Sequence, residues 1–191
     1  MHWNHESTAG RFWQSPPALL APLLALACVL AGRPVPAQAA ERDAPVHHVD
    51  GSFVREWLVL GPFPSRDMEA DFLAEAGGEA NVRPKEGDSV STSGGQRLTW
   101  TRLRSPHDLV NLERAFGIQD GAVAYAYCEL QSEQPGESHA RAFAFDTTVV
   151  RLNGEAVGTT ADLAGARRDL APLLRFQLKA GGNACLLKLK G

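Results

Sequence analysis

Apolar and polar residues alternate over many short stretches of the chain beyond residue 52. Alternation is typical of strands with one buried face, because successive side chains of a strand point to opposite sides of the sheet. The clearest stretch, residues 122–130, has small residues on one face and Val123, Tyr125 and Tyr127 on the other. The pattern predicts strands over 53–60, 97–103, 122–130, 140–145, 147–152, 155–158, 173–178 and 184–189.

Turn-forming residues separate these strands. Asn153-Gly154 suits a type I′ hairpin, because both residues tolerate positive φ, and Gly181-Gly182-Asn183 predicts a turn between the last two strands. Gly61-Pro62 is expected to end the first strand. Short helices are predicted over 67–76 and 108–112, and exposed loops over 83–96, 131–139 and 159–170. The sequence therefore predicts an all-β fold, an antiparallel β-sandwich of the jelly-roll type with one or two short helices.

The first 39 residues have the organisation of a secretory signal peptide. An apolar run over 18–32 follows Arg11, and Ala37-Gln38-Ala39 after it matches an A-x-A cleavage site. The run is shorter than the roughly 20 residues that span a bilayer. We therefore expect cleavage after Ala39 and a secreted, periplasmic or cell-surface protein. An uncleaved anchor and lipidation at Cys28 are less favoured alternatives.

The remainder of the 191-residue chain is expected to be a flexible segment, 40–52, followed by one β-sandwich domain, 53–191. The formal net charge is −3, and the cations form no basic stripe, which argues against a nucleic-acid partner. No second apolar run is long enough to span a membrane after signal cleavage.

Two cysteines follow the signal peptide, and both lie on predicted inward faces of strands. An even number in an exported chain permits one disulfide, between Cys128 and Cys185. Two buried thiols that pack as small apolar side chains would explain the same residues. The sequence leaves both interpretations open.

Three pieces of the chain together resemble a family of exported bacterial domains with a galactose-binding-like jelly roll, similar to carbohydrate-binding modules. They are Trp57-Leu58-Val59-Leu60-Gly61-Pro62-Phe63 with Gly77-Gly78-Glu79, then 122–127, then Arg151-Leu152-Asn153-Gly154-Glu155 with 178–183. The resemblance implies an accessory module beside a hydrolase, or a stand-alone exported protein. It covers the chain from about residue 53 to the end.

The chain departs from the family pattern in two places. The family has Ser-Asp-Asp-Gly before the Leu-Asn-Gly strand, whereas this chain has Phe145-Asp146-Thr147-Thr148 and keeps one acidic residue there. The family also continues beyond the last strand, whereas this sequence stops at Gly191. Two interpretations follow: the sequence is a fragment of a longer domain, or its sheet lacks an edge partner and has a bare edge after Leu189.

Several residue sets are candidates for ligand contacts. Loop residues with guanidinium, carboxylate and amide groups are suited to sugar hydroxyls, and the candidates of this kind are Asp146, Asn153, Arg167, Arg168 and Asp169. Aromatic rings could provide stacking platforms, although rings within apolar strands more often fill the core; they are Trp57, Trp100, Tyr125 and Tyr127.

The acidic residues Asp67, Asp71 and Glu79 are candidate ligands of a structural calcium ion, although their spacing matches no EF-hand and a solvated helix face explains them more simply. No other cofactor is expected. The chain lacks Gly-x-Ser-x-Gly and His-Glu-x-x-His motifs, so we predict no enzymatic activity.

The function predicted from the sequence is non-catalytic carbohydrate binding by an exported domain. One alternative is a structural or protein-interaction module without a sugar ligand, whose partner strand pairs with the C-terminal sheet edge. Another is an accessory domain of a secreted hydrolase.

Overall fold

The computed structural model describes residues 43–108, 110, 112–116, 121–141, 147–159 and 173–191, all within the compact unit Ala39–Gly191. The predicted signal peptide lies outside the described residues, as do Asp146, Arg167, Arg168 and Asp169. The described elements are nearly all strands, which confirms the all-β prediction. Two short helical turns accompany them, η1 (Ala74–Ala76) and α1 (Leu112–Phe116).

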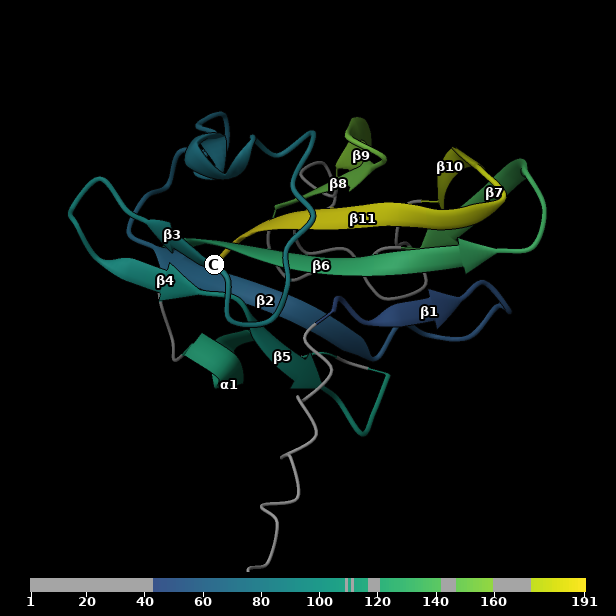
Figure 1. Ribbon diagram of the computed structural model, residues 1–191, viewed down its shortest axis with the longest axis horizontal. Helices are drawn as coiled ribbons and strands as arrows, with labels where there is room; N and C mark the ends of the chain where they lie inside the picture. Colours follow the sequence, from purple (N-terminus) through teal and green to yellow (C-terminus); the bar gives the residue numbers. More distant parts are fainter. Residues whose placement is uncertain (1–42, 109, 111, 117–120, 142–146, 160–172) are drawn as a thin grey trace, which may run out of the picture. The chain divides into compact units, whose positions relative to one another are not determined.

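A seven-stranded, mainly antiparallel sheet forms the centre of the domain (Figure 1). Its strands follow the order β5-β2-β6-β11-β8-β9, and β1 pairs in parallel with the end of β6. Their bounds are β1 Val46–His48, β2 Glu56–Phe63, β5 Thr101–Arg104, β6 Val123–Ser132, β8 Thr148–Leu152, β9 Glu155–Thr159 and β11 Gly181–Lys190. Two small sheets complete the fold, β3 (Ser89–Ser91) with β4 (Arg97–Thr99), and β7 (Gly136–Arg141) with β10 (Leu173–Leu178).

The small β7–β10 sheet continues the central β6–β11 pair. Strand β6 pairs with β11 down to Ser132 and Gly181, and pairing resumes between Gly136 in β7 and Leu178 in β10. The two antiparallel pairs are therefore one ribbon, bent where the pairing is interrupted. Strands that pass from one sheet to another at a bend make such corners in β-domains. The predicted turn at 181–183 is thus part of a corner, and β10 pairs with β7 rather than with β11.

Both faces of the seven-stranded sheet are covered by apolar side chains. Tyr125 and Tyr127 of β6 face one cluster, and Ala126 and Cys128 face the other, as the alternation predicts. The first cluster includes Leu73, Val82, Val90, Leu98 and Trp100, which come from residues 64–100. The second includes Leu178, with Phe176 and residues of α1 packed against it. Residues 64–100 thus form a cover over one face, hereafter the 64–100 cover.

Several predicted limits are wrong, for identifiable reasons. Strand β1 lies within 40–52, which the sequence indicated to be flexible, because its backbone pairs with Glu129–Gln131 of β6. Strand β2 runs on through Gly61-Pro62 to Phe63, with a cis peptide and a shift of register there. The predicted loop 83–96 contains β3, which buries Val90. The predicted helix over 67–76 is reduced to η1, although Gly77 does cap it with φ 96°.

The expectation of a bare C-terminal strand is also wrong. Strand β11 lies inside the sheet, where Cys185 to Leu189 pair with β6 on one side and with β8 on the other. Sequence order does not reveal this position, because the partners come from two distant segments. A partner protein at a sheet edge remains a prediction, but β11 does not offer that edge.

The Asn153-Gly154 turn forms the β8–β9 hairpin as predicted. Asn153 has φ 51° and Gly154 has φ 91°, and Leu152 pairs with Glu155 across the turn. Gly154 also contacts the 64–100 cover, because a Cβ atom there would lie 2.4 Å from the carbonyl oxygen of Ala80. Glycine at this position therefore allows both the positive φ of the turn and the close contact with Ala80 of the 64–100 cover.

We predict that Gly154→Ala lowers the free energy of unfolding by about 2 to 4 kcal/mol, because it adds a steric clash to the cost of positive φ. Gly95→Ala is the matched control, since Gly95 also has positive φ but a Cβ atom there would meet nothing within 4 Å. It should cost about 1 kcal/mol. Urea unfolding of both variants measures the difference, and equal losses would contradict a close contact at Ala80.

Candidate functional site

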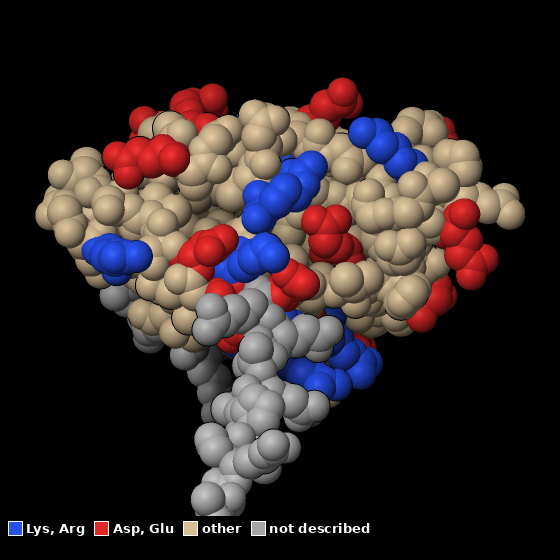
Figure 2. Space-filling model, viewed as in Figure 1, with Lys and Arg blue, Asp and Glu red and all other residues tan. Residues whose placement is uncertain are grey.

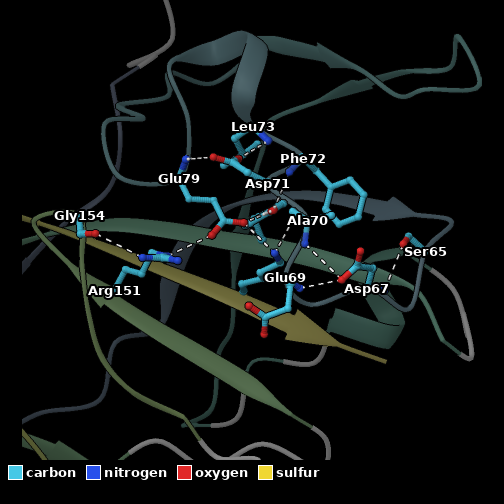
Figure 3. Close-up of polar contacts among 12 residues, drawn as sticks. Ser65, Asp67, Glu69, Ala70, Asp71, Phe72, Leu73, Glu79, Arg151 and Gly154 are labelled. Carbon is cyan, nitrogen blue, oxygen red and sulfur yellow. Dashed lines mark hydrogen bonds and ion pairs between the residues drawn. The ribbon is translucent and has the colours of Figure 1, made fainter.

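Glu79 is the centre of a buried polar cluster beneath the 64–100 cover (Figure 3). One carboxylate oxygen accepts hydrogen bonds from the Tyr125 hydroxyl at 2.6 Å and from Lys188 Nζ at 2.8 Å. The other accepts from Arg151 Nε at 3.1 Å. The cluster joins a loop residue to side chains of β6, β8 and β11. Its polar groups therefore hold the cover on the sheet.

Lys188 is buried as deeply as an apolar residue. Its side chain is 2% exposed and that of Glu79 is 6% exposed. The ammonium group also donates to the carbonyl oxygen of Ala70 at 2.6 Å and lies over the rings of Phe72 and Tyr125. A buried charge needs such partners, because removal from water is costly. The sequence did not identify Lys188 as a buried residue, because the alternation of apolar and polar residues in β11 does not distinguish a buried lysine from a solvated one.

The carboxylates of the candidate calcium ligands accept hydrogen bonds from other groups of the protein. Asp67 accepts the backbone N–H groups of Glu69 and Ala70, and Asp71 accepts those of Leu73 and Glu79 (Figure 3). Within the described part of the chain, no group of three or more His, Cys, Asp or Glu side chains is placed to hold a metal ion. The structure thus uses these carboxylates to shape the loop and to neutralise Lys188 and Arg151. Calcium binding remains an untested prediction.

Asn153, the one loop candidate for sugar binding that the structure describes, is occupied by a structural contact. Its amide Nδ2 donates to Oδ1 of Asn183 at 2.9 Å, and its Oδ1 accepts from the backbone N–H of Ala184 at 3.1 Å. Asn183 is fully buried, and its own amide donates to carbonyl oxygens that include those of Leu130 and Lys179. The two asparagines stabilise the corner between the β6–β11 and β7–β10 pairs.

The aromatic candidates are core residues. Trp57 is 8% exposed, Trp100 and Tyr127 are 1% exposed, and Tyr125 is fully buried. None of the four presents a ring that a sugar could stack on, so the core alternative is the correct one. Trp57 has a positioning role, since its indole N–H donates to the carbonyl oxygen of Val54 at 3.2 Å.

A cleft of about 460 Å³ lies where the β1–β2 connection meets the end of β5. Its lining combines apolar, hydroxyl, guanidinium and carboxylate groups, and comprises Val46, His47, Ser52, Phe53, Val54, Arg55, Glu56, Arg104, Ser105 and Pro106. Phe53 is 61% exposed there, which makes it an aromatic ring that solvent can reach. The sequence did not predict this cleft, because its walls come from segments about fifty residues apart in the chain.

The walls of this cleft are held by short contacts. Ser105 donates its backbone N–H to the carbonyl oxygen of Arg55 at 2.8 Å, and Arg55 forms an exposed ion pair with Asp108 at 2.5 Å. Glu56 is paired with Arg102 at 2.8 Å. The lining carries two guanidinium groups, from Arg55 and Arg104, against one carboxylate, from Glu56. Such groups can bind hydroxyl or acidic groups of a ligand by paired hydrogen bonds.

Charges of both signs are mixed on the part of the described surface that Figure 2 shows. Lys and Arg side chains are interspersed with Asp and Glu on the face in Figure 2. Among the residues that the structure describes, no helix is both long and apolar enough to span a membrane. Comparisons with family models, with curated proteins and with solved structures found no match.

We predict that Glu79→Gln costs about 3 kcal/mol or more of unfolding free energy, because it leaves Lys188 buried without its counter-ion. Asp43→Asn is the matched control: it breaks an ion pair of the same 2.8 Å length to Lys85, but both of those side chains are more than half exposed. Asp43→Asn should change stability little. The double variant Glu79→Gln/Lys188→Met should recover part of the loss. Similar urea midpoints for the two single variants would refute the assigned role of Glu79.

The two tyrosines, the only ones in the chain, should resist ionisation in the folded protein. Burial raises the pKa of both, and the hydrogen bonds to Glu79 and Glu129 raise it further. Unfolded tyrosine ionises near pH 10, so only the unfolded state loses these protons as the pH rises above about 10. Stability is therefore complete below that pH and falls above it. Ultraviolet titration should show no tyrosinate at pH 10 in folded protein and about half in urea; tyrosinate in folded protein at pH 10 would disprove this.

Proposed function

We propose that the protein is a non-catalytic carbohydrate-binding domain whose ligand occupies the cleft beside Phe53. The observation that carries the proposal is an exposed aromatic ring next to guanidinium, carboxylate and hydroxyl groups in one cleft. Sugar rings offer C–H groups to an aromatic face and hydroxyls to polar side chains. The cleft has both kinds of group within one small volume.

The charges of the lining favour a particular class of saccharide. Arg104 is exposed at the end of β5, and its guanidinium adds to that of Arg55, whose charge Asp108 already balances. Hydrogen bonds to a carboxylate are roughly twice as strong as those between neutral groups. We therefore propose that uronate-containing saccharides bind more tightly than neutral ones.

Two further elements of the proposal rest on the sequence. The resemblance of 53–191 to exported galactose-binding-like jelly rolls supports a binding role, and the corner of the β6–β11 ribbon is compatible with a fold of that kind. The signal-like segment 1–39 supports export. Both stay proposals alongside the ligand.

A protein-interaction module is the second candidate. Val46, Val49 and Phe53 are all exposed within eight residues, at 58%, 43% and 61%. Large apolar side chains gathered on a surface often mark a contact with another protein. This function predicts that the same residues matter but that no saccharide binds.

Titration calorimetry of the full chain with an oligogalacturonate and with a neutral galacto-oligosaccharide of equal length tests the proposal. Phe53→Ala should weaken binding of both at least about tenfold, which corresponds to 1.4 kcal/mol. Arg104→Ala should weaken only the oligogalacturonate, by a similar factor, because it removes charge but no stacking surface.

Two exposed residues outside the cleft lining provide matched controls, Leu173→Ala in β10 and Arg97→Ala in β4, which should leave both affinities unchanged. Absence of binding to either saccharide would overturn the carbohydrate proposal and favour the protein-interaction module. Equal losses in cleft and control variants would show that the saccharide binds elsewhere.

A further inference from the structure

Cys128 and Cys185 are directly opposite each other on the two central strands. Cys128 lies in β6 and Cys185 in β11, and the antiparallel register pairs them. Both are free thiols, Cys128 fully buried and Cys185 7% exposed. They lie among apolar side chains on the sheet face against which residues of β10 and α1 pack. The tertiary structure thus brings together two cysteines that are distant in sequence.

The position of this pair in the β-ladder meets one geometric requirement of a disulfide, the distance between the two Cα atoms. Gly191 donates its N–H to the carbonyl oxygen of Ala122 at 2.9 Å, which places these two residues opposite each other in a hydrogen-bonded pair. Hydrogen-bonded and non-hydrogen-bonded pairs alternate along an antiparallel ladder, so Cys128 and Cys185, six positions further on, are of the hydrogen-bonded kind. Such pairs have Cα atoms about 5.5 Å apart, which is within the Cα range of disulfides. Their Cβ atoms lie farther apart than those of non-hydrogen-bonded pairs, so the two strands must approach each other as the bond forms.

We propose that Cys128 and Cys185 form a cross-strand disulfide that locks β6 to β11, and that the two free thiols are its reduced form. The bond forms by thiol–disulfide exchange with a small disulfide oxidant such as oxidised glutathione. One protein thiolate attacks the oxidant and releases one glutathione thiolate. The second protein thiolate then attacks the mixed disulfide and releases the other. Two protein thiols are oxidised, and one oxidant disulfide is reduced to two thiols.

Burial determines when this exchange takes place. The pKa of the Cys128 thiol is raised by burial and by its contact with Cys185, so little reactive thiolate is present once the sheet is complete. An oxidant also cannot reach a fully buried sulfur. The exchange therefore occurs during folding, before the apolar cover closes over the pair. The bond then encloses residues 129–184. A closed loop of that length greatly lowers the conformational entropy of the unfolded chain, which stabilises the folded state.

Refolding of the full chain with a mixture of oxidised and reduced glutathione tests the proposal. Cys28→Ser is the background, because it removes the third cysteine and leaves only the proposed pair. Peptide mapping without reduction should recover the peptides of Cys128 and Cys185 linked together. The urea midpoint of the oxidised protein should exceed that of the reduced protein by about 1 to 2 M.

A second variant separates the disulfide from packing effects. Cys28→Ser/Cys128→Ala keeps a small apolar side chain in the core and should give the same midpoint in oxidising and reducing buffer. Recovery of both cysteines as free, alkylatable thiols after oxidative refolding would overturn the proposal. A linked protein with a lower midpoint than its reduced form would also overturn it, since the strands would then oppose the bond. Neither outcome bears on the cleft, so the proposed function is tested independently.

Discussion

The buried contact between Glu79 and Lys188 holds the two main parts of this domain together. A carboxylate from the 64–100 cover and an ammonium group from the central strand β11 meet at 2.8 Å, with almost no access to water. Arg151 and the Tyr125 hydroxyl also donate hydrogen bonds to the Glu79 carboxylate. Either charge alone would be costly to bury, so each one stabilises the placement of the cover on the sheet only while the other is present. The apolar cluster beneath the cover depends on that placement.

A second constraint acts at the other end of β11. Asn183 accepts and donates hydrogen bonds at the point where the β6–β11 pair gives way to the β7–β10 pair, and Asn153 joins it from the β8–β9 turn. The same strand therefore carries Lys188 for one face, Asn183 for the corner and Cys185 for the pairing with β6. The lining of the proposed ligand cleft includes none of these three residues. The cleft is built from a surface connection, where exposed side chains are compatible with a rigid sheet behind them.

Much of the fold could be predicted from the sequence, because local preferences and the tertiary structure agree there. The alternation in β6 identified which residues face each apolar cluster, and Asn153-Gly154 identified its hairpin correctly. The prediction failed where a distant partner decided the outcome. Residues 46–48 form a strand because they pair in parallel with Glu129–Gln131 of β6. Residues 181–183 form part of a corner because β10 pairs with β7. Of the predicted site, Asn153 makes a structural contact and the aromatic candidates fill the core, while Asp146, Arg167, Arg168 and Asp169 lie outside the described residues.

The sequence by itself determined the all-β class, the two faces of the main strands and the β8–β9 hairpin, because these follow from residues within a few positions of one another. Only the tertiary structure decided that Glu79 meets Lys188, that Cys128 faces Cys185, and that Phe53 stands beside Arg104. Each of these pairs joins segments separated by about fifty residues or more, so the packing of distant strands and loops, not the local pattern, sets the distance between them. The chemistry of this protein lies in such long-range contacts.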